Sequence, residues 1–199
     1  MARILVLVAD GFDDQELQGL TKALREDGQD VVRVGPKRGE TVTGKGGQEV
    51  QVDLDPLQVN HSASHVVVVP GGPGADKLVE NSQMVNVVYS MAHKGRIVVA
   101  VGRGVRMLPP VAKQKSPNPV ATGTKVLQGD LLKGRLVTGD AEARQELEKA
   151  GAHWSDGPVV TDLPLVTARS ARGDDLGLLL DELAPLLPLA EQPVVSQIL

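Results

Sequence analysis

The segment IVVAVGRGV, residues 97–105, joins an apolar strand pattern to a sharp glycine turn and the start of a helical pattern. In many α/β hydrolytic enzymes such a turn carries the nucleophile, because it raises one side chain above the sheet at a helix N-terminus. Here the turn is Gly102-Arg103-Gly104 and holds no serine, cysteine or threonine. Arg103 cannot act as a base, since its guanidinium stays protonated at working pH. Ser170 and Thr138 do not follow a strand into a turn of this kind and are interpreted as loop hydroxyls.

The same turn has the features of a pocket for a small anion. Gly102 and Gly104 lack side chains, so their backbone N–H groups are open to close approach. The helix that follows would present its positive end. Arg103 adds a forked donor that suits a carboxylate or a phosphate. The alternative is that Arg103 pairs with a nearby acid and has a structural role.

Two other groups of residues could bind a metal ion. Asp10, Asp13 and Asp14 are close in sequence, but they precede a helical pattern, so helix capping by solvated carboxylates is the favoured interpretation. His61 and His65 are four residues apart, but His65 adjoins an apolar strand and no third ligand is evident. We therefore predict no metal site and no cofactor.

Composition narrows the class of protein. The 199 residues are 41% hydrophobic and 23% charged, with a net charge of −4 and no basic block, which argues against nucleic-acid binding. The absence of cysteine excludes disulfides, thiolate metal sites and cysteine nucleophiles. The apolar start, residues 3–9, is too short for a signal peptide, and no run approaches a membrane span. We predict a cytoplasmic protein without membrane contact.

Alternating strand and helix patterns predict a parallel sheet of βαβ units. Strands are expected over 3–9, 30–35, 65–72, 97–101, 134–139, 158–160 and 165–170, and a hairpin over 41–53. Helices are expected over 13–28, 82–95, 142–152 and 176–187. The proline-rich segment 109–130 is predicted to be a loop excursion, and 188–199 a C-terminal tail. Without a clear linker, residues 1–187 are expected to form one domain.

Several motifs in this order resemble the DJ-1/PfpI (ThiJ/PfpI) family of the class I glutamine-amidotransferase-like superfamily. They are ILVLVADGFDDQEL, HVVVVPGGPGADKL, GRIVVAVGRGVRML, LLKGRLVTG and ELEKAGAHWSDGPVVTDLPLVTARS. The resemblance covers roughly residues 2–185. It implies an α/β fold, a flavodoxin-like three-layer sandwich with a mostly parallel sheet, and assembly into homodimers or larger homo-oligomers.

The sequence departs from the family at the reactive positions. Where the family has Ala-Ile-Cys-His-Gly, this chain has Gly102 at the cysteine and Arg103 at the histidine. The family glutamate that hydrogen-bonds the cysteine corresponds to Glu16, although an acid early in a helix also suits the helix dipole. The acid after the second glycine turn corresponds to Asp76. The candidate ligand-binding residues are thus Glu16, Gly72, Asp76, Gly102, Arg103 and Gly104.

These observations favour a pseudoenzyme, a non-catalytic member of the family. The resemblance implies that it self-associates and has a link to stress. One alternative is a hydrolase or glyoxalase-like enzyme in which Glu16 activates water without a covalent step. A general base alone accelerates a reaction by about 10²–10⁴-fold. The other is a protein that binds a small anionic or carbonyl compound through Arg103. The structural alternative pairs Arg103 with Glu16 or Asp76.

Overall fold

The computed structural model describes residues 1–114 and 131–190. Its centre is a six-stranded sheet in the order β2-β1-β5-β6-β10-β9. The strands are β1 (Arg3–Leu7), β2 (Asp30–Val34), β5 (Val66–Val69), β6 (Ile97–Val101), β9 (Val159–Asp162) and β10 (Leu165–Ala168). All neighbours are parallel except β9 and β10, which pair antiparallel. The predicted mostly parallel α/β sheet is confirmed.

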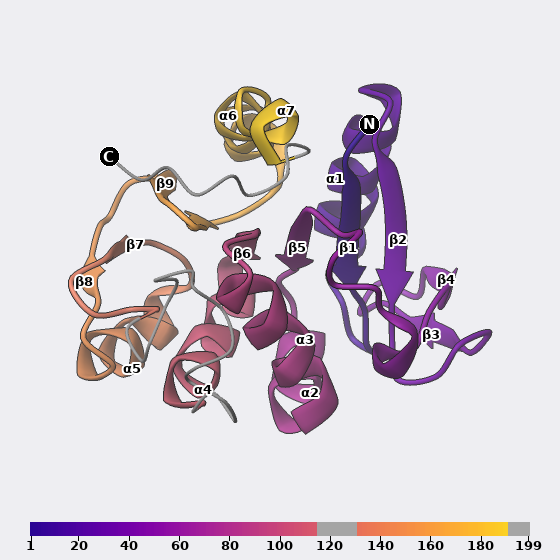
Figure 1. The fold of residues 1–199 in the computed structure, drawn as a ribbon, viewed down its shortest axis with the longest axis horizontal. Coiled ribbons are helices and arrows are strands. Elements are labelled where there is room, and N and C mark those ends of the chain that lie inside the picture. Colours follow the sequence, from indigo (N-terminus) through magenta and orange to yellow (C-terminus); the bar gives the residue numbers. More distant parts are fainter. Residues whose placement is uncertain (115–130, 191–199) are drawn as a thin grey trace.

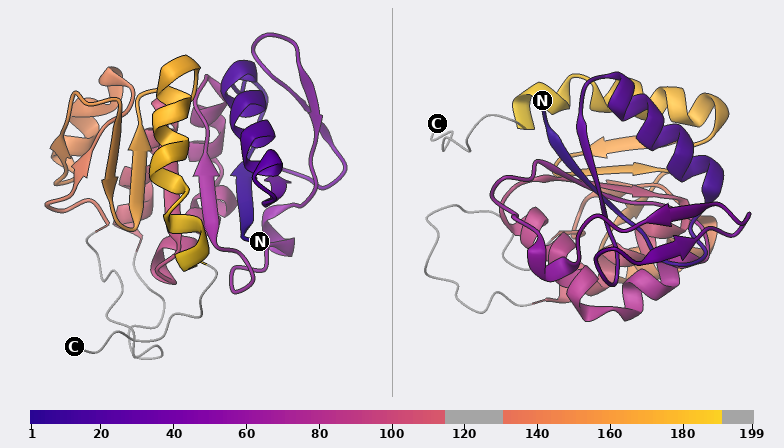
Figure 2. Two further views of the ribbon diagram at one scale, coloured as in Figure 1. Left: turned by 90° about the horizontal axis from the view of Figure 1, so that it is seen from above. Right: turned by 90° about the vertical axis from the view of Figure 1, so that its right-hand side faces the viewer.

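Helices cover both faces of this sheet (Figures 1 and 2). On one face lie α1 (Asp14–Glu26), α6 (Gly173–Leu183) and α7 (Leu186–Ala190), and on the other lie α2 (Gly74–Glu80), α3 (Ser82–His93) and α4 (Leu108–Lys113). Two apolar clusters fill the layers, one around Leu17, Leu20 and Leu179 and the other around Met84 and Met91. The strands are apolar on both faces because each face meets helices.

Shorter elements decorate the sandwich. They are the hairpin β3 (Thr41–Thr43) and β4 (Glu49–Gln51), the pair β7 (Leu136–Val137) and β8 (His153–Trp154), the helix α5 (Arg144–Lys149), and the 3-10 turns η1 (Pro56–Gln58), η2 (Gly102–Met107) and η3 (Ala141–Ala143). The predicted hairpin is confirmed. Within the described residues, no helix is long and apolar enough to cross a membrane.

The loop prediction for 109–130 is wrong at its start, because α4 covers Leu108–Lys113. Pro109 and Pro110 lie in the first turn of this helix, where proline removes no intrahelical hydrogen bond. Residues 115–130 lie outside the described residues. Helix α7 likewise extends into the start of the predicted tail, and 191–199 lie outside the described residues.

The site is positioned by the carboxyl ends of β1, β5, β6 and β10. Parallel strands bring these ends to one edge of the sheet, and the strand order reverses at β1, which lies between β2 and β5. Ligands of open α/β sheets bind beside such a reversal of strand order. A ligand site is therefore expected where the loops after these four strands meet.

The turn after β6 packs tightly beneath β5 at Gly104. A Cβ at Gly104 would collide with the Val69 carbonyl oxygen and lie 2.8 Å from that of Pro70. Because these atoms belong to the backbone, Gly104→Ala should lower the free energy of unfolding by about 3 kcal/mol. The melting temperature should fall by roughly 6–12 °C.

Gly177→Ala is the matched control for this prediction. Gly177 lies within α6, and a Cβ there would meet no atom within 4 Å. Alanine should stabilise this helix by about 0.5–1 kcal/mol. Equal melting temperatures for the two alanine variants would contradict the close-packed turn.

Candidate functional site

A cavity of about 570 Å³ lies where the four strand ends meet. Asp13 and Glu16 follow β1, Gly71 and Gly72 follow β5, and Gly102 and Arg103 follow β6. Arg169 follows β10, and Trp154 and Asp156 form part of another wall. The volume is within the range of small-molecule sites, roughly 300–1,000 Å³. Of the six predicted site residues, the structure brings Glu16, Gly72, Gly102 and Arg103 to this cavity.

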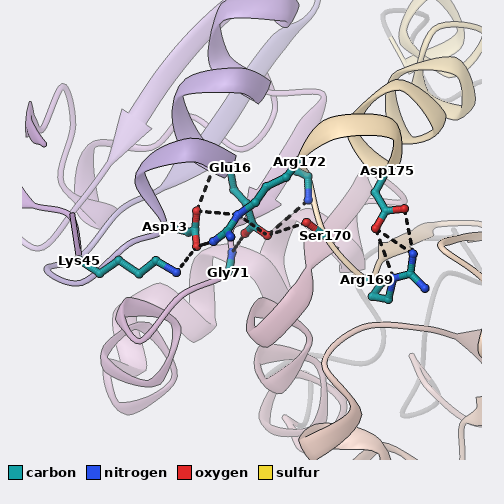
Figure 3. A network of polar contacts seen from close by, with 9 residues as sticks. Asp13, Glu16, Lys45, Gly71, Arg169, Ser170, Arg172 and Asp175 are labelled. Carbon is teal, nitrogen blue, oxygen red and sulfur yellow. Dashed lines mark hydrogen bonds and ion pairs between the residues drawn. The ribbon is translucent and has the colours of Figure 1, made fainter.

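Glu16 is the buried acid of the site, with 6% of its surface exposed. It lies in the first turn of α1 and points toward the loops after β5 and β10 (Figure 3). Gly71 N donates to Oε2 at 3.2 Å, while Ser170 Oγ and Ala171 N donate to Oε1 at 3.2 and 3.4 Å. Burial raises the pKa of Glu16 above its ordinary value of 4.5, and the three hydrogen bonds oppose this rise.

The raised pKa of Glu16 makes a prediction about stability and pH. The folded state holds the Glu16 proton more tightly than the unfolded state, so stability is lost as pH rises from about 4.5 through the folded pKa. Glu16→Gln should remove this loss, because glutamine is uncharged at every pH. Denaturant unfolding of the wild type and the variant between pH 4 and 8 measures the difference.

Glu49→Gln provides the matched control, since Glu49 is an exposed residue of β4 outside the cavity. Its unfolding curves should parallel those of the wild type at every pH. If the free-energy difference between wild type and Glu16→Gln did not change with pH, the raised pKa would be wrong.

Asp13 is the N-cap of α1 and accepts from Glu16 N at 3.1 Å. The prediction that it caps a helix is confirmed, but the prediction that it stays solvated is wrong, because only 2% of it is exposed. Lys45 Nζ lies 2.5 Å from Oδ2, and Arg172 pairs with both carboxylate oxygens. Two cations thus compensate the charge of this buried carboxylate (Figure 3).

Sequence reasoning missed Lys45 and Arg172. Lys45 lies at the tip of the β3–β4 hairpin, and Arg172 is the N-cap residue of α6. Both residues lie more than 30 positions away from Asp13 in the sequence, and neither belongs to a local pattern. The feature of the sequence that came closest to indicating this contact was the position of Lys45 in the glycine-rich centre of the predicted hairpin.

Arg103 is paired with Asp76 of α2. Its Nε lies 3.0 and 3.1 Å from the two Asp76 oxygens, and its Nη2 lies 2.9 Å from Oδ2. Arg106 Nη1 also lies 3.5 Å from Asp76 Oδ1, and Glu142 accepts from Arg106 Nη2 at 3.4 Å and forms an ion pair with Arg103. The hydrogen bonds to Asp76 raise the pKa of Arg103 above its ordinary value. The arrangement matches the structural alternative, in which the arginine pairs with Asp76.

The three glycines differ in their placement. Gly72 and Gly102 line the cavity with positive φ angles of +87° and +51°, whereas Gly104 packs beneath β5. A Cβ at Gly102 would make only ordinary contacts, 3.4 Å from the Arg169 carbonyl oxygen and 3.9 Å from Glu16 Oε1. A side chain at Gly102 would therefore project beside Glu16.

Two hydroxyl groups near the cavity have acceptors of their own. Thr138 Oγ1 donates to the Gly157 carbonyl oxygen at 2.7 Å, and its N–H donates to Thr167 Oγ1. Ser170 Oγ donates to Glu16. Within the described residues, no group of three or more His, Asp or Glu side chains could hold a metal ion. The arrangement suits reversible binding or acid–base chemistry by Glu16.

Known proteins share this arrangement of elements. The model of the DJ-1/PfpI family matches residues 2–116 and 112–180. YraA of Bacillus subtilis is 31% identical over 87% of this chain and 91% of its own, and a deglycase of Thermococcus kodakarensis is 30% identical over 84% and 89%. The crystal structure of an Anabaena variabilis protein with DJ-1/ThiJ/PfpI-like and ferritin-like domains aligns with a TM-score of 0.79 and 26% identity. This alignment covers 98% of our chain and 52% of that two-domain protein.

Proposed function

Because the chain belongs to the DJ-1/PfpI family but has no cysteine, we propose that it binds a small polar ligand without covalent catalysis. One observation carries the proposal: a cavity of about 570 Å³ persists around Glu16 and Gly102, although Gly102 stands at the family's cysteine position. Deglycase chemistry through a thiolate has no nucleophile in this chain. The cavity itself is large enough to bind a small ligand without a covalent bond.

The lining supports a ligand with both donor and acceptor groups. Lys45 and Arg169 bring positive charge, and Asp140 and Asp156 bring negative charge. Glu16 lines the cavity beside Gly71 and Gly102, so its carboxyl group can hydrogen-bond a polar ligand placed there. A small compound with a carbonyl and a carboxyl group fits this chemistry.

Trp154 gives a direct test of binding, because it is the only tryptophan in the chain and it lines the cavity. Its fluorescence should change saturably with glyoxylate or methylglyoxal. Loss of one hydrogen bond between the ligand and Glu16 should raise the Kd about tenfold. Glu16→Gln should therefore bind the ligand more weakly by roughly that factor. Glu49→Gln should bind as the wild type does.

Titration with inorganic phosphate separates the anion-binding alternative. A saturable response to phosphate that Arg103→Ala abolishes would favour anion binding by Arg103. Absence of a saturable response to all three compounds would overturn the proposed binding function.

A second candidate function is a hydrolase or glyoxalase-like activity with Glu16 as general base. The observation that favours it is the position of Glu16, a buried acid that lines the cavity and whose pKa is raised by burial. Ser170 and the backbone of residue 71 already donate to this carboxylate, which lowers its basicity. We therefore rank this candidate below reversible binding.

We also propose self-association into a homodimer or larger homo-oligomer, as the family resemblance implies. Light scattering during size-exclusion chromatography measures the mass directly, and a mass of 21.0 kDa would show a monomer and contradict this proposal. The stress-linked role and the cytoplasmic location stay predictions from the resemblance and the sequence.

A further inference from the structure

A second hollow of about 740 Å³ adjoins the first cavity, and the two share a wall. Asp13 and Lys45 line both of them. Gln15, Gln18 and Gln48 line only the second hollow, which is thus rich in amide side chains. The ion pair between Lys45 and Asp13 therefore lies between a cavity that contains Glu16 and a neighbouring polar hollow.

The two cations on Asp13 do not hold it equally. Arg172 contributes two contacts, from Nε at 3.2 Å and from Nη2, whereas Lys45 contributes Nζ alone. If the lysine moved away, the buried carboxylate would keep Arg172 and the Glu16 N–H. The Lys45 side chain is 45% exposed and ends in a readily hydrated ammonium group. Because the ammonium group is partly exposed and Arg172 stays on the carboxylate, turning Lys45 toward solvent costs less than breaking a fully buried pair.

The hairpin that carries Lys45 is fixed by its backbone. Lys45 N donates to the Phe12 carbonyl oxygen at 2.9 Å, and Thr43 N donates to Asp10 at the same distance. Asp14 accepts from Gly46 N at 2.7 Å and from Gln48 N at 2.8 Å. Asp10 and Asp14 thus hold the hairpin against the start of α1. Movement of Lys45 needs only rotation of its side chain.

We propose that Lys45 is a side-chain gate that determines the length of ligand this site accepts. With Lys45 on Asp13, the first cavity receives a compact ligand. With Lys45 turned toward solvent, the two hollows join, and an elongated polar ligand places its head beside Glu16 and its tail beside Gln15 and Gln18. The inference rests on the proposed function for its ligand, but its test needs no ligand.

A cysteine introduced at position 102 can report on the gate, because the natural chain contains none and Gly102 lines the first cavity. In Gly102→Cys protein, alkylation rates are measured with iodoacetamide and with a maleimide attached to a short polar peptide. Both reagents need the thiolate, so the ratio of their rates cancels any change in thiol pKa. The ratio isolates the passage of a long reagent.

Lys45→Ala in this background should raise the peptide-to-iodoacetamide rate ratio by roughly two- to fivefold, the factor expected when a partly exposed ion pair is removed. Lys77→Ala is the control, since it removes an exposed lysine paired with Asp10 outside both hollows. An unchanged ratio in Lys45→Ala, or an equal rise in Lys77→Ala, would overturn the gate. Either outcome is independent of whether glyoxylate binds.

Salt gives a second measurement that needs no Lys45 variant. Screening weakens exposed ion pairs, so the ratio should rise with salt when Lys45 is present and stay constant in Lys45→Ala. If the cysteine variant fails to fold, quenching of Trp154 by acrylamide and by an acrylamide-labelled peptide replaces alkylation. A peptide quencher that reached Trp154 equally well with and without Lys45 would contradict the gate.

Discussion

Gly102→Cys is expected to create a reactive thiol and to start turnover of methylglyoxal in a protein whose own turnover we expect to be at background. The new side chain would project into the cavity beside Glu16, because a Cβ added at Gly102 would lie 3.9 Å from Glu16 Oε1. General-base catalysis accelerates a reaction by about 10²-fold or more. The turnover rate of Gly102→Cys should therefore exceed that of Gly102→Ala by at least this factor. The second substitution Arg103→His, which restores the family pair, should raise it further.

Gly102→Ala is the matched control, because it adds the same Cβ at the same φ of +51° without a thiol. Both variants should lose about 1–2 kcal/mol of stability, the usual cost of a left-handed conformation for a residue with a Cβ. Methylglyoxal consumption and iodoacetamide labelling measure the thiol. An unreactive cysteine in a folded Gly102→Cys protein would show that the cavity is not the family's reactive site.

Asp13→Ala is expected to destabilise the protein strongly. It removes the cap of α1 and leaves Lys45 and Arg172 without their shared carboxylate. Breaking a fully buried pair costs about 3–5 kcal/mol, but these two cations are 45% and 41% exposed, so we expect about 2–3 kcal/mol. The melting temperature should fall by roughly 5–10 °C.

Asp55→Ala separates the capping effect from the loss of charge. Asp55 caps η1 through Leu57 N and Gln58 N. Its loss should cost about 0.5–1 kcal/mol, the lower range for a cap. Denaturant unfolding at neutral pH measures both variants, and equal losses would show that the ion pairs on Asp13 contribute no stability.

The central sheet could be predicted from the sequence because its strands are continuous apolar runs. The run VVVV at 66–69 faces helices on both sides of the sheet, so its uninterrupted apolar sequence directly indicates a buried strand. The turn at Gly102 could also be predicted, since the strand, the glycines and the helical pattern are adjacent. Short elements such as α2 were missed, because seven residues give too little periodicity to recognise.

The polar network of the site could not be predicted in the same way. Glu16 was recognised through the family resemblance, but its partners Ser170 and Ala171 lie more than 150 residues away. Asp13 was expected to stay in solvent, because its sequence neighbourhood is acidic and polar. Its burial depends on the tertiary contacts of the hairpin and of the loop before α6, which no local pattern encodes.

The measurement that tests the central claim most directly is turnover of methylglyoxal and a model ester by the purified wild-type chain, beside Glu16→Gln and Arg103→Ala. The account predicts background rates for all three proteins, together with saturable quenching of Trp154 by a small carbonyl compound. Wild-type turnover above background that disappears in Glu16→Gln would contradict it and establish a cysteine-free enzyme in which Glu16 is the base.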